Sequence, residues 1–204
     1  MHICCLDLEG VLLPEIWIQV AEKTKIKELR LTTRDLPDYD ALMRQHLAIL
    51  KREGIRLRDI QEVISKIKPL TGAKDFLDKL RSHVPVIILT DSYYEFILPL
   101  VKSLGFPTVW CNWLSVDQKG FIANYFMRQQ NGKEKAVLAL QEIGFKVKAA
   151  GDSYNDITML KAADEGILFN PPDRIIGEYP QFKVAKNYNT LLKSLTCLPS
   201  SPGT

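Results

Sequence analysis

Two acidic side chains stand at the end of a short apolar segment close to the start of the chain. Asp7 and Glu9 follow Ile3-Cys4-Cys5-Leu6, a run whose length and composition are typical of a buried strand. Because side chains alternate along a strand, both carboxylates point to the same side, about 6 to 7 Å apart. Carboxylates that close repel each other, so the pair indicates a bound cation, a shifted pKa, or one ionised and one protonated acid. Alone, the pair is equally typical of a solvated acidic turn.

Two further groups of polar residues follow strand-like segments downstream. Thr90-Asp91-Ser92 comes after Val86-Ile87-Ile88-Leu89, and Gly151-Asp152-Ser153 comes after Val147-Lys148-Ala149-Ala150. The carboxyl ends of parallel strands meet at one edge of a sheet, so both groups are expected beside Asp7.

Together these residue types suit phosphoryl transfer. The carboxylates of Asp7, Glu9 and Asp152 are hard oxygen ligands of the kind that Mg²⁺ takes in proteins. The hydroxyl of Thr90 and the ammonium of Lys133, which opens another helix, can bind a phosphate group. Asp7 is the candidate nucleophile, and Glu9 is the candidate general acid that later acts as the base.

Helical and strand-like segments alternate along most of the chain. This alternation predicts an α/β fold with a doubly wound parallel core sheet. Between about residues 14 and 70, however, three helical patterns follow one another without a strand. We therefore predict a core domain of residues 1–13 and 71–204 and a small helical cap, residues 14–70, inserted after the first strand and overhanging its acidic end.

Four local features carry further expectations. The pattern predicts a helix from Tyr93 to Leu104 with a bend at Pro99. Residues 113–127 are expected to form a hairpin, and 166–169 to form the last strand. The Pro- and Ser-rich residues 199–204 are expected to be a frayed tail.

The composition excludes several classes of protein. The 204 residues carry a net charge of +3 with scattered Lys and Arg, so nucleic-acid binding is not expected. No apolar run approaches the roughly 20 residues of a membrane span, and no signal peptide is expected before the first strand. The four cysteines, Cys4, Cys5, Cys111 and Cys197, have no metal-binding or redox spacing and are typical of a reduced protein. We therefore expect a cytoplasmic protein, whose oligomeric state the sequence leaves open.

The motifs and their order resemble the haloacid dehalogenase superfamily of phosphatases. Asp7-x-Glu9 after the first strand, Thr90 after the second, Lys133 before a helix, and Gly151-Asp152-Ser153-Tyr154-Asn155-Asp156 after a later strand are similar to its four motifs. The helical insert and Glu15 resemble the phosphoserine phosphatases within it. The opening Asp-Leu-Glu-Gly-Val is similar to a bacterial branch described as both phosphoserine phosphatase and homoserine phosphotransferase.

This resemblance implies a Mg²⁺-dependent reaction on O-phospho-L-serine through an aspartyl phosphate, with homoserine left open as a second phosphoryl acceptor. It implies Asp7 as nucleophile, Glu9 as proton donor, and Asp7, Glu9 (through its backbone carbonyl) and Asp152 as the metal ligands. It also implies that polar side chains bind the substrate: Glu15 at the ammonium, Thr90, Asp91 and Lys133 near the phosphate, and Asn155 near the substrate. We also expect His46 to bind the substrate, with either His46 or Arg44 at its carboxylate.

Two positions depart from the family's pattern. Most of the superfamily has Asp where Glu9 stands, and the extra methylene moves the acid by roughly 1.5 Å, which favours transfer to an alcohol relative to water. The related branch has Arg at the position of His46, whereas here Arg44 lies two residues earlier on a different helix face. A half-charged His pairs with a carboxylate more weakly than an Arg does.

Other functions stay open at the level of the sequence. The chain has no dinucleotide fingerprint, P-loop or serine nucleophile elbow. A phosphatase of another small phosphate monoester and a non-catalytic phosphate-binding protein on the same fold both fit the motifs. A receiver-type signalling module also uses acids, a Thr and a Lys, but it lacks the 14–70 insert, and its Lys follows the last acid, whereas Lys133 precedes Asp152.

Overall fold

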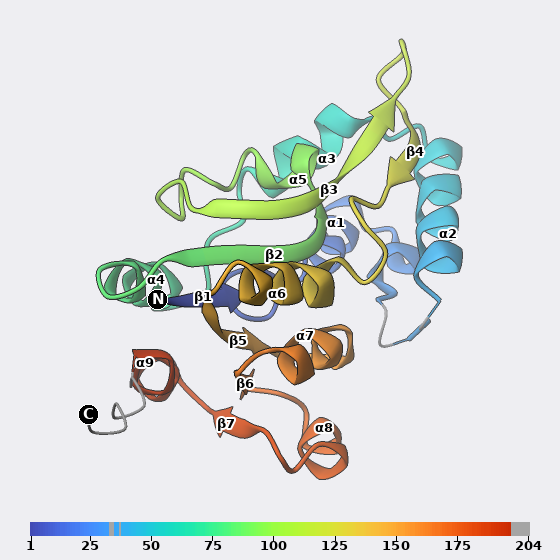
Figure 1. Cartoon of the computed structure of the whole chain (residues 1–204). Helices are drawn as coiled ribbons and strands as arrows, with labels where there is room; N and C mark the ends of the chain where they lie inside the picture. Colours follow the sequence, from blue (N-terminus) through green and yellow to red (C-terminus); the bar gives the residue numbers. More distant parts are fainter. Residues whose placement is uncertain (33–34, 37, 197–204) are drawn as a thin grey trace, which may run out of the picture.

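A central sheet organises the molecule, as the computed structural model shows for residues 1–32, 35–36 and 38–196 (Figure 1). Within these residues seven strands run in the order β4-β3-β2-β1-β5-β6-β7. Every neighbouring pair is parallel except β3 and β4. The strands are β1 His2–Leu6, β2 Val86–Tyr93, β3 Thr108–Val116, β4 Ile122–Phe126, β5 Lys146–Gly151, β6 Glu165–Phe169 and β7 Lys183–Ala185.

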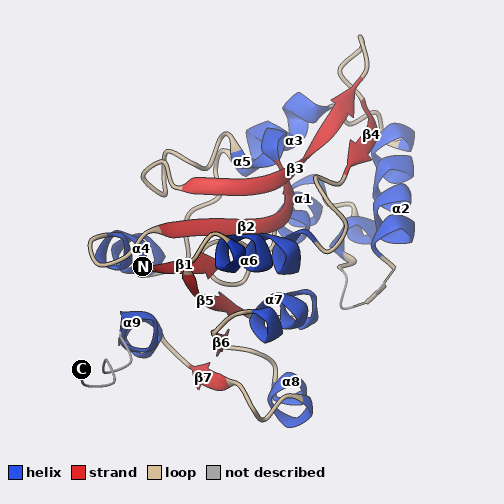
Figure 2. Ribbon diagram, viewed as in Figure 1, coloured by secondary structure: helices blue, strands red, loops and turns tan. Residues whose placement is uncertain are grey.

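Helices cover both faces of this sheet, which confirms the predicted doubly wound α/β fold (Figure 2). One hydrophobic cluster joins the sheet to α6 and α7, and another joins it to α4 and α9. Cys4 belongs to the second cluster and Cys5 to the first, as expected of neighbours on a strand. The helices are α4 Ala73–Arg81, α5 Tyr94–Ile97, α6 Gly132–Glu142, α7 Ile157–Ala162, α8 Asp173–Glu178 and α9 Tyr188–Thr196. Among the described helices, none has the length and hydropathy needed to span a bilayer.

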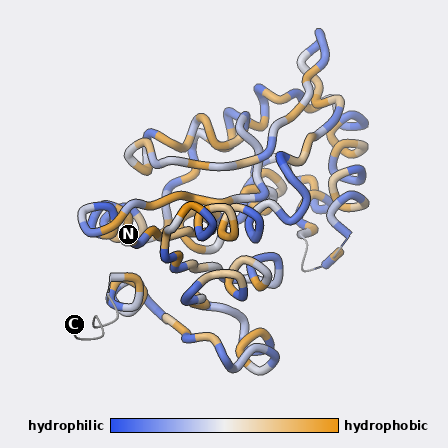
Figure 3. Tube along the Cα trace, viewed as in Figure 1, coloured by the Kyte–Doolittle hydropathy of each residue, from blue (hydrophilic) through white to orange (hydrophobic). Residues whose placement is uncertain are grey.

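Four helical elements follow β1 and lie on the side toward which that strand points (Figure 1). They are α1 Ile16–Thr24, the 3₁₀ helix η1 Lys27–Arg30, α2 Tyr39–Arg52 and α3 Leu57–Ile64. Their apolar side chains recur at helical spacing and belong to the same hydrophobic cluster as α4. Figure 3 shows hydrophobic and hydrophilic residues alternating along α2. Their positions lie inside the predicted insert, and the division into a core of 1–13 with 71–204 and a cap of 14–70 stays a prediction.

The prediction of a helix from Tyr93 to Leu104 is wrong, because α5 ends at Ile97 and the chain continues in tight turns. Pro99 has no N–H to continue the helical ladder. Beyond it, Leu100 N donates to Ile97 O at 2.7 Å, a bond over three residues instead of four. The carbonyl of Glu95 instead accepts a hydrogen bond from Nε2 of Gln61 in α3, at 2.8 Å.

Segment 166–169 is a strand, but it is not the last one, so that prediction is wrong. After β6 come α8, the three-residue strand β7 and α9. A strand as short as β7 has too few residues for a readable alternation of apolar and polar positions. The hairpin expected within 113–127 is confirmed by β3 and β4, whereas the predicted tail, 199–204, lies outside the described residues.

Close packing between β6 and α7 generates a test of the fold. A Cβ atom on Gly166 would lie 2.4 Å from the carbonyl oxygen of Leu160 in α7, so the backbone would have to move. We expect Gly166→Ala to lower the free energy of unfolding by about 1–3 kcal/mol, as measured by urea denaturation. The matched control is Gly177→Ala in α8, where a Cβ meets nothing within 4 Å; it should be neutral or stabilising by about 0.5–1 kcal/mol. Equal stabilities of the two variants would contradict the packing described.

Candidate active site

A buried ammonium group joins four separate segments at the carboxyl ends of the central strands. Nζ of Lys133, near the start of α6, donates to Oδ1 of Asp7 at 2.8 Å and to Oδ1 of Asp156 at 2.7 Å. It also lies 3.6 Å from Oδ2 of Asp91. Burial lowers the pKa of Lys133, but the carboxylates of Asp156, Asp7 and Asp91 more than offset this, so the pKa is raised well above its usual value. Lys133 is therefore a fixed positive charge.

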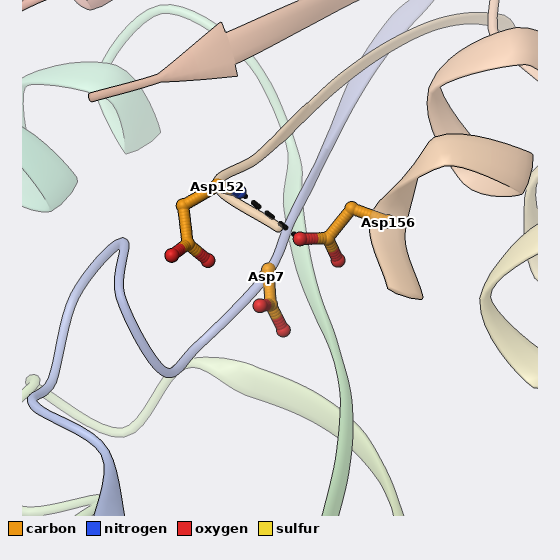
Figure 4. Close-up of side chains that lie close together, drawn as sticks. All are labelled: Asp7, Asp152 and Asp156. Atoms are coloured by element: carbon orange, nitrogen blue, oxygen red, sulfur yellow. Dashed lines mark hydrogen bonds between the residues drawn. The ribbon is translucent and has the colours of Figure 1, made fainter. Parts of the chain in front are cut away.

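Three buried carboxylates gather beside this ammonium (Figure 4). Asp7, Asp152 and Asp156 each place an oxygen within 4.8 Å of the others. Oδ2 of Asp156 accepts hydrogen bonds from the backbone N–H groups of Asp152 and Ser153 at 3.0 and 3.1 Å, so it also shapes the turn that carries Asp152. Burial, followed by the nearby Asp156 carboxylate, raises the pKa of Asp7 well above its usual value. The cluster has an excess of negative charge, which a divalent cation would offset.

The turn after β1 passes directly against this acidic cluster. Gly10 has a positive φ of 80°, and a Cβ there would lie 2.3 Å from Oδ2 of Asp152. Only glycine accommodates both the backbone conformation and the contact. The turn therefore brings Glu9 to the same site as Asp7 and Asp152.

Glu9 is half-buried, in surroundings that favour its protonated form. Burial, and then the negative charge of Glu15, raise the pKa of Glu9 to about 8. The N–H of Ile16, which donates to Oε2 of Glu9 at 2.8 Å, and the hydroxyl of Ser92 counteract this only in part. A carboxyl group in this state can give a proton to a neighbouring oxygen at neutral pH.

These groups open into one small cavity of about 80 Å³. Pockets for drug-sized ligands measure roughly 300–1,000 Å³, so the cavity suits a much smaller molecule. Both charged and apolar side chains line it: Asp7, Glu9, Glu15, Trp17, Thr32, Tyr39, Leu42, Met43, Thr90, Asp91, Ser92, Tyr93, Lys133, Ser153 and Asn155.

An irregularity in β2 helps to bring three of these side chains to the cavity. The pairing register with β3 shifts between Leu89 and Tyr93, so the strand bulges there. The residues within the bulge, Thr90-Asp91-Ser92, all line the cavity. Oδ2 of Asp91 also accepts a hydrogen bond from Nδ2 of Asn155 at 3.2 Å.

Two tyrosines that the sequence analysis missed close one side of the cavity. Tyr39, the first residue of α2, donates from its hydroxyl to the backbone carbonyl of Asp91 at 3.0 Å. Its oxygen lies 2.6 Å from the hydroxyl of Tyr93 in β2. The inserted helices are thereby bonded to the strand that supplies Thr90 and Asp91.

The cavity brings together most of the residues predicted for the site, namely Asp7, Glu9, Glu15, Thr90, Asp91, Lys133 and Asn155. Asp152 stands behind them, with its carboxylate beside that of Asp7. His46 is different, because it is fully buried and does not line the cavity; it packs on Trp17, which does, at a ring distance of 4.3 Å. Arg44 is exposed and pairs with Asp40 at 2.6 Å. The structure thus brings neither side chain to the cavity, and the roles of all these residues stay predictions.

Residues 1–164 match the haloacid dehalogenase-like hydrolases, and the chain belongs to this family. It is 53% identical over 193 residues to a phosphoserine phosphatase of Pseudomonas syringae pathovar tomato, covering 95% of this chain and 81% of that protein. It is 52% identical over 191 residues to phosphoserine phosphatase ThrH of Pseudomonas aeruginosa, covering 94% of this chain and 93% of that protein. A crystal structure of phosphoserine phosphatase in its apo form has the same fold, with a TM-score of 0.78 at 19% identity over 95% of this chain and 98% of that one.

Burial of His46 generates a prediction about stability and pH. Burial lowers its pKa to about 4, from an ordinary value of 6.5, although the backbone of Leu31 partly counteracts this. The unfolded chain therefore takes up the proton first, and the stability that neutral His46 contributes is present above pH 6.5 and lost toward pH 4. Between pH 7 and pH 4 the free energy of unfolding of the wild-type chain, measured with urea, should fall by about 3 kcal/mol more than that of His46→Leu. His83→Gln, at an exposed histidine, is the control, and equal pH dependence in wild type and His46→Leu would contradict the prediction.

Proposed function

We propose that this hydrolase converts O-phospho-L-serine to L-serine and phosphate, and that the phosphoryl group passes through Asp7. The observation that carries the proposal is the convergence of Asp7, Lys133 and Asp152, from three distant parts of the chain, with Glu9 at the same small cavity. The substrate is inferred from the relatives named phosphoserine phosphatase, at 52% and 53% identity over nearly the whole chain.

The donor set fits Mg²⁺. Carboxylate oxygens are hard ligands, and the buried cluster of Asp7, Asp152 and Asp156 carries more negative charge than Lys133 balances. In the proposal, Asp7, Asp152 and the backbone carbonyl of Glu9 bind the ion, while Asp156 orients Lys133 and the turn after β5. When bound, Mg²⁺ neutralises charge on the phosphate and lowers the pKa of Asp7.

The side chains present can supply the nucleophile and the proton transfers for both halves of the reaction. A carboxylate oxygen of Asp7 attacks phosphorus, the bond from phosphorus to the serine oxygen breaks, and the proton of Glu9 passes to that leaving oxygen. Water then attacks the aspartyl phosphate and gives a proton to Glu9, which restores the Asp7 carboxylate and releases phosphate. The ammonium of Lys133 and the hydroxyl of Thr90 bind the phosphoryl oxygens throughout.

Recognition of the amino acid falls to the rest of the cavity. Glu15 carries the charge that an ammonium group needs, and Asn155 and Asp91 stand together on the cavity wall. The small volume of about 80 Å³ favours a small phosphate ester. We further propose that the enzyme acts in the cytoplasm, in the biosynthesis of serine.

Replacing the nucleophile gives the decisive test. Asp7→Asn keeps the size of the side chain but weakens the nucleophile, so phosphate release from phosphoserine should fall by more than about a thousandfold. EDTA should abolish wild-type release, and added Mg²⁺ should restore it. Asp75→Asn, on the exposed side of α4, is the control and should keep wild-type turnover. Phosphate release by Asp7→Asn at the wild-type rate would refute the role of Asp7.

A second acceptor is proposed because Glu9 is one methylene longer than the aspartate common in the family. In this proposal, Glu9, whose Oε2 accepts a hydrogen bond from the N–H of Ile16, deprotonates an alcohol that enters the cavity. Turnover of phosphoserine with added homoserine should yield phosphohomoserine in addition to free phosphate. We expect this product to increase with homoserine at the expense of free phosphate, and its absence at saturating homoserine would leave water as the acceptor.

A further inference from the structure

The last described helix reaches back to the turn that carries Glu9. Tyr188, the first residue of α9, donates from its hydroxyl to the backbone carbonyl of Val11 at 2.7 Å, across 177 positions of sequence. Residues 165–196 lie beyond the segment that matches the hydrolase family. The contact therefore comes from a part of the chain that the family motifs do not include.

The ring of Tyr188 has little freedom. It is stacked with Phe76 of α4 at 5.0 Å between centroids and with Phe169 of β6 at 4.9 Å, each at an angle of 25°. Gly72 closes a third side, because a Cβ there would lie 3.3 Å from the tyrosine ring. Three elements thus fix the direction in which the hydroxyl points.

The turn that receives this hydrogen bond is short and buried. Leu8, Val11, Leu12 and Leu13 are fully buried, and N–H groups of Leu12 and Leu13 both donate to the carbonyl of Leu8, at 2.8 and 2.9 Å. Glu9 lies within this turn, two residues before the carbonyl that Tyr188 binds. A shift of the Val11 carbonyl therefore moves the backbone of Glu9 as well.

Contacts from several parts of the chain hold this turn in place. Gly10 rests against the carboxylate of Asp152, and the side chain of Glu9 binds the N–H of Ile16 at the start of α1. Tyr188 binds the carbonyl of Val11, and the N–H of Leu70 donates to the carbonyl of Leu12 at 2.9 Å. Loss of the hydrogen bond from Tyr188 would leave a buried carbonyl oxygen without a donor, and the turn can relieve that cost by moving.

We propose that Tyr188 is a positioning residue for Glu9. Its hydroxyl holds the Val11 carbonyl so that the carboxyl group of Glu9 stays at the leaving oxygen of the substrate. This inference rests on the proposed function, in which Glu9 gives its proton to the departing alkoxide.

Comparing substrates with different leaving groups distinguishes the positioning role of Tyr188 from a general loss of folded protein. A serine alkoxide needs a proton as it departs, whereas p-nitrophenolate is a weak base and departs without one. The ratio kcat/KM reports the steps up to formation of the aspartyl phosphate, so it isolates this first proton transfer. A misplaced Glu9 should therefore lower kcat/KM for phosphoserine much more than for p-nitrophenyl phosphate.

The test uses Tyr188→Phe, which keeps the stacked ring and removes only the hydroxyl. We expect kcat/KM for phosphoserine to fall about tenfold, mainly through kcat, and kcat/KM for p-nitrophenyl phosphate to stay within about twofold. Glu9→Gln should show the same selectivity with a larger loss. Two controls should show no selectivity: Tyr179→Phe, a matched substitution away from the turn, and Gly166→Ala, which lowers stability alone.

An equal loss for both phosphate esters, or no loss for either, would overturn the positioning role of Tyr188. Failure of the wild-type chain to hydrolyse phosphoserine contradicts the proposed function alone. In that case, an alkyl phosphate that the chain does hydrolyse replaces phosphoserine in the same comparison.

Discussion

The ammonium of Lys133, buried among the carboxylates of Asp7, Asp91 and Asp156, is the interaction on which the rest of the structure depends. An isolated charge in that position would cost several kcal/mol, and an unpaired carboxylate would cost as much. Pairing them ties α6 to the ends of β1, β2 and β5. Because three acids surround one base, negative charge exceeds positive charge at this point, and Asp152 increases the excess that a bound cation would offset.

The turn after β1 links this charged centre to the helices above it. Glu9 binds the start of α1, Gly10 leaves room for Asp152, and Val11 is bound by α9. Tyr39 adds a second link, from α2 to the bulged part of β2. The carboxyl groups of Asp7 and Glu9 are thus held by both the sheet and the helices that follow β1, which explains how a short, tight turn can keep them in place.

Much of this could be predicted from the sequence, because strand ends in a parallel sheet share one edge whatever their separation in the chain. That rule alone is enough to predict that Asp7, Thr90 and Asp152 lie together. Tyr39 and Tyr188 could not be found in this way, since nothing local distinguishes a tyrosine that reaches across the molecule from one in the core. His46 lies on the apolar stripe of α2 with Met43 and Leu50, but the spacing cannot tell whether that stripe faces a cavity or another ring.

The hydrogen bond from the N–H of Ile16 to Glu9 has a consequence for how this position can evolve. The same carboxyl group that we propose as the proton donor also accepts a hydrogen bond from the first N–H of α1. An aspartate at position 9 could not serve both functions unless α1 moved closer to the turn. A change of Glu9 to Asp is therefore not neutral here, because it would have to be accompanied by a change in the position of the start of α1.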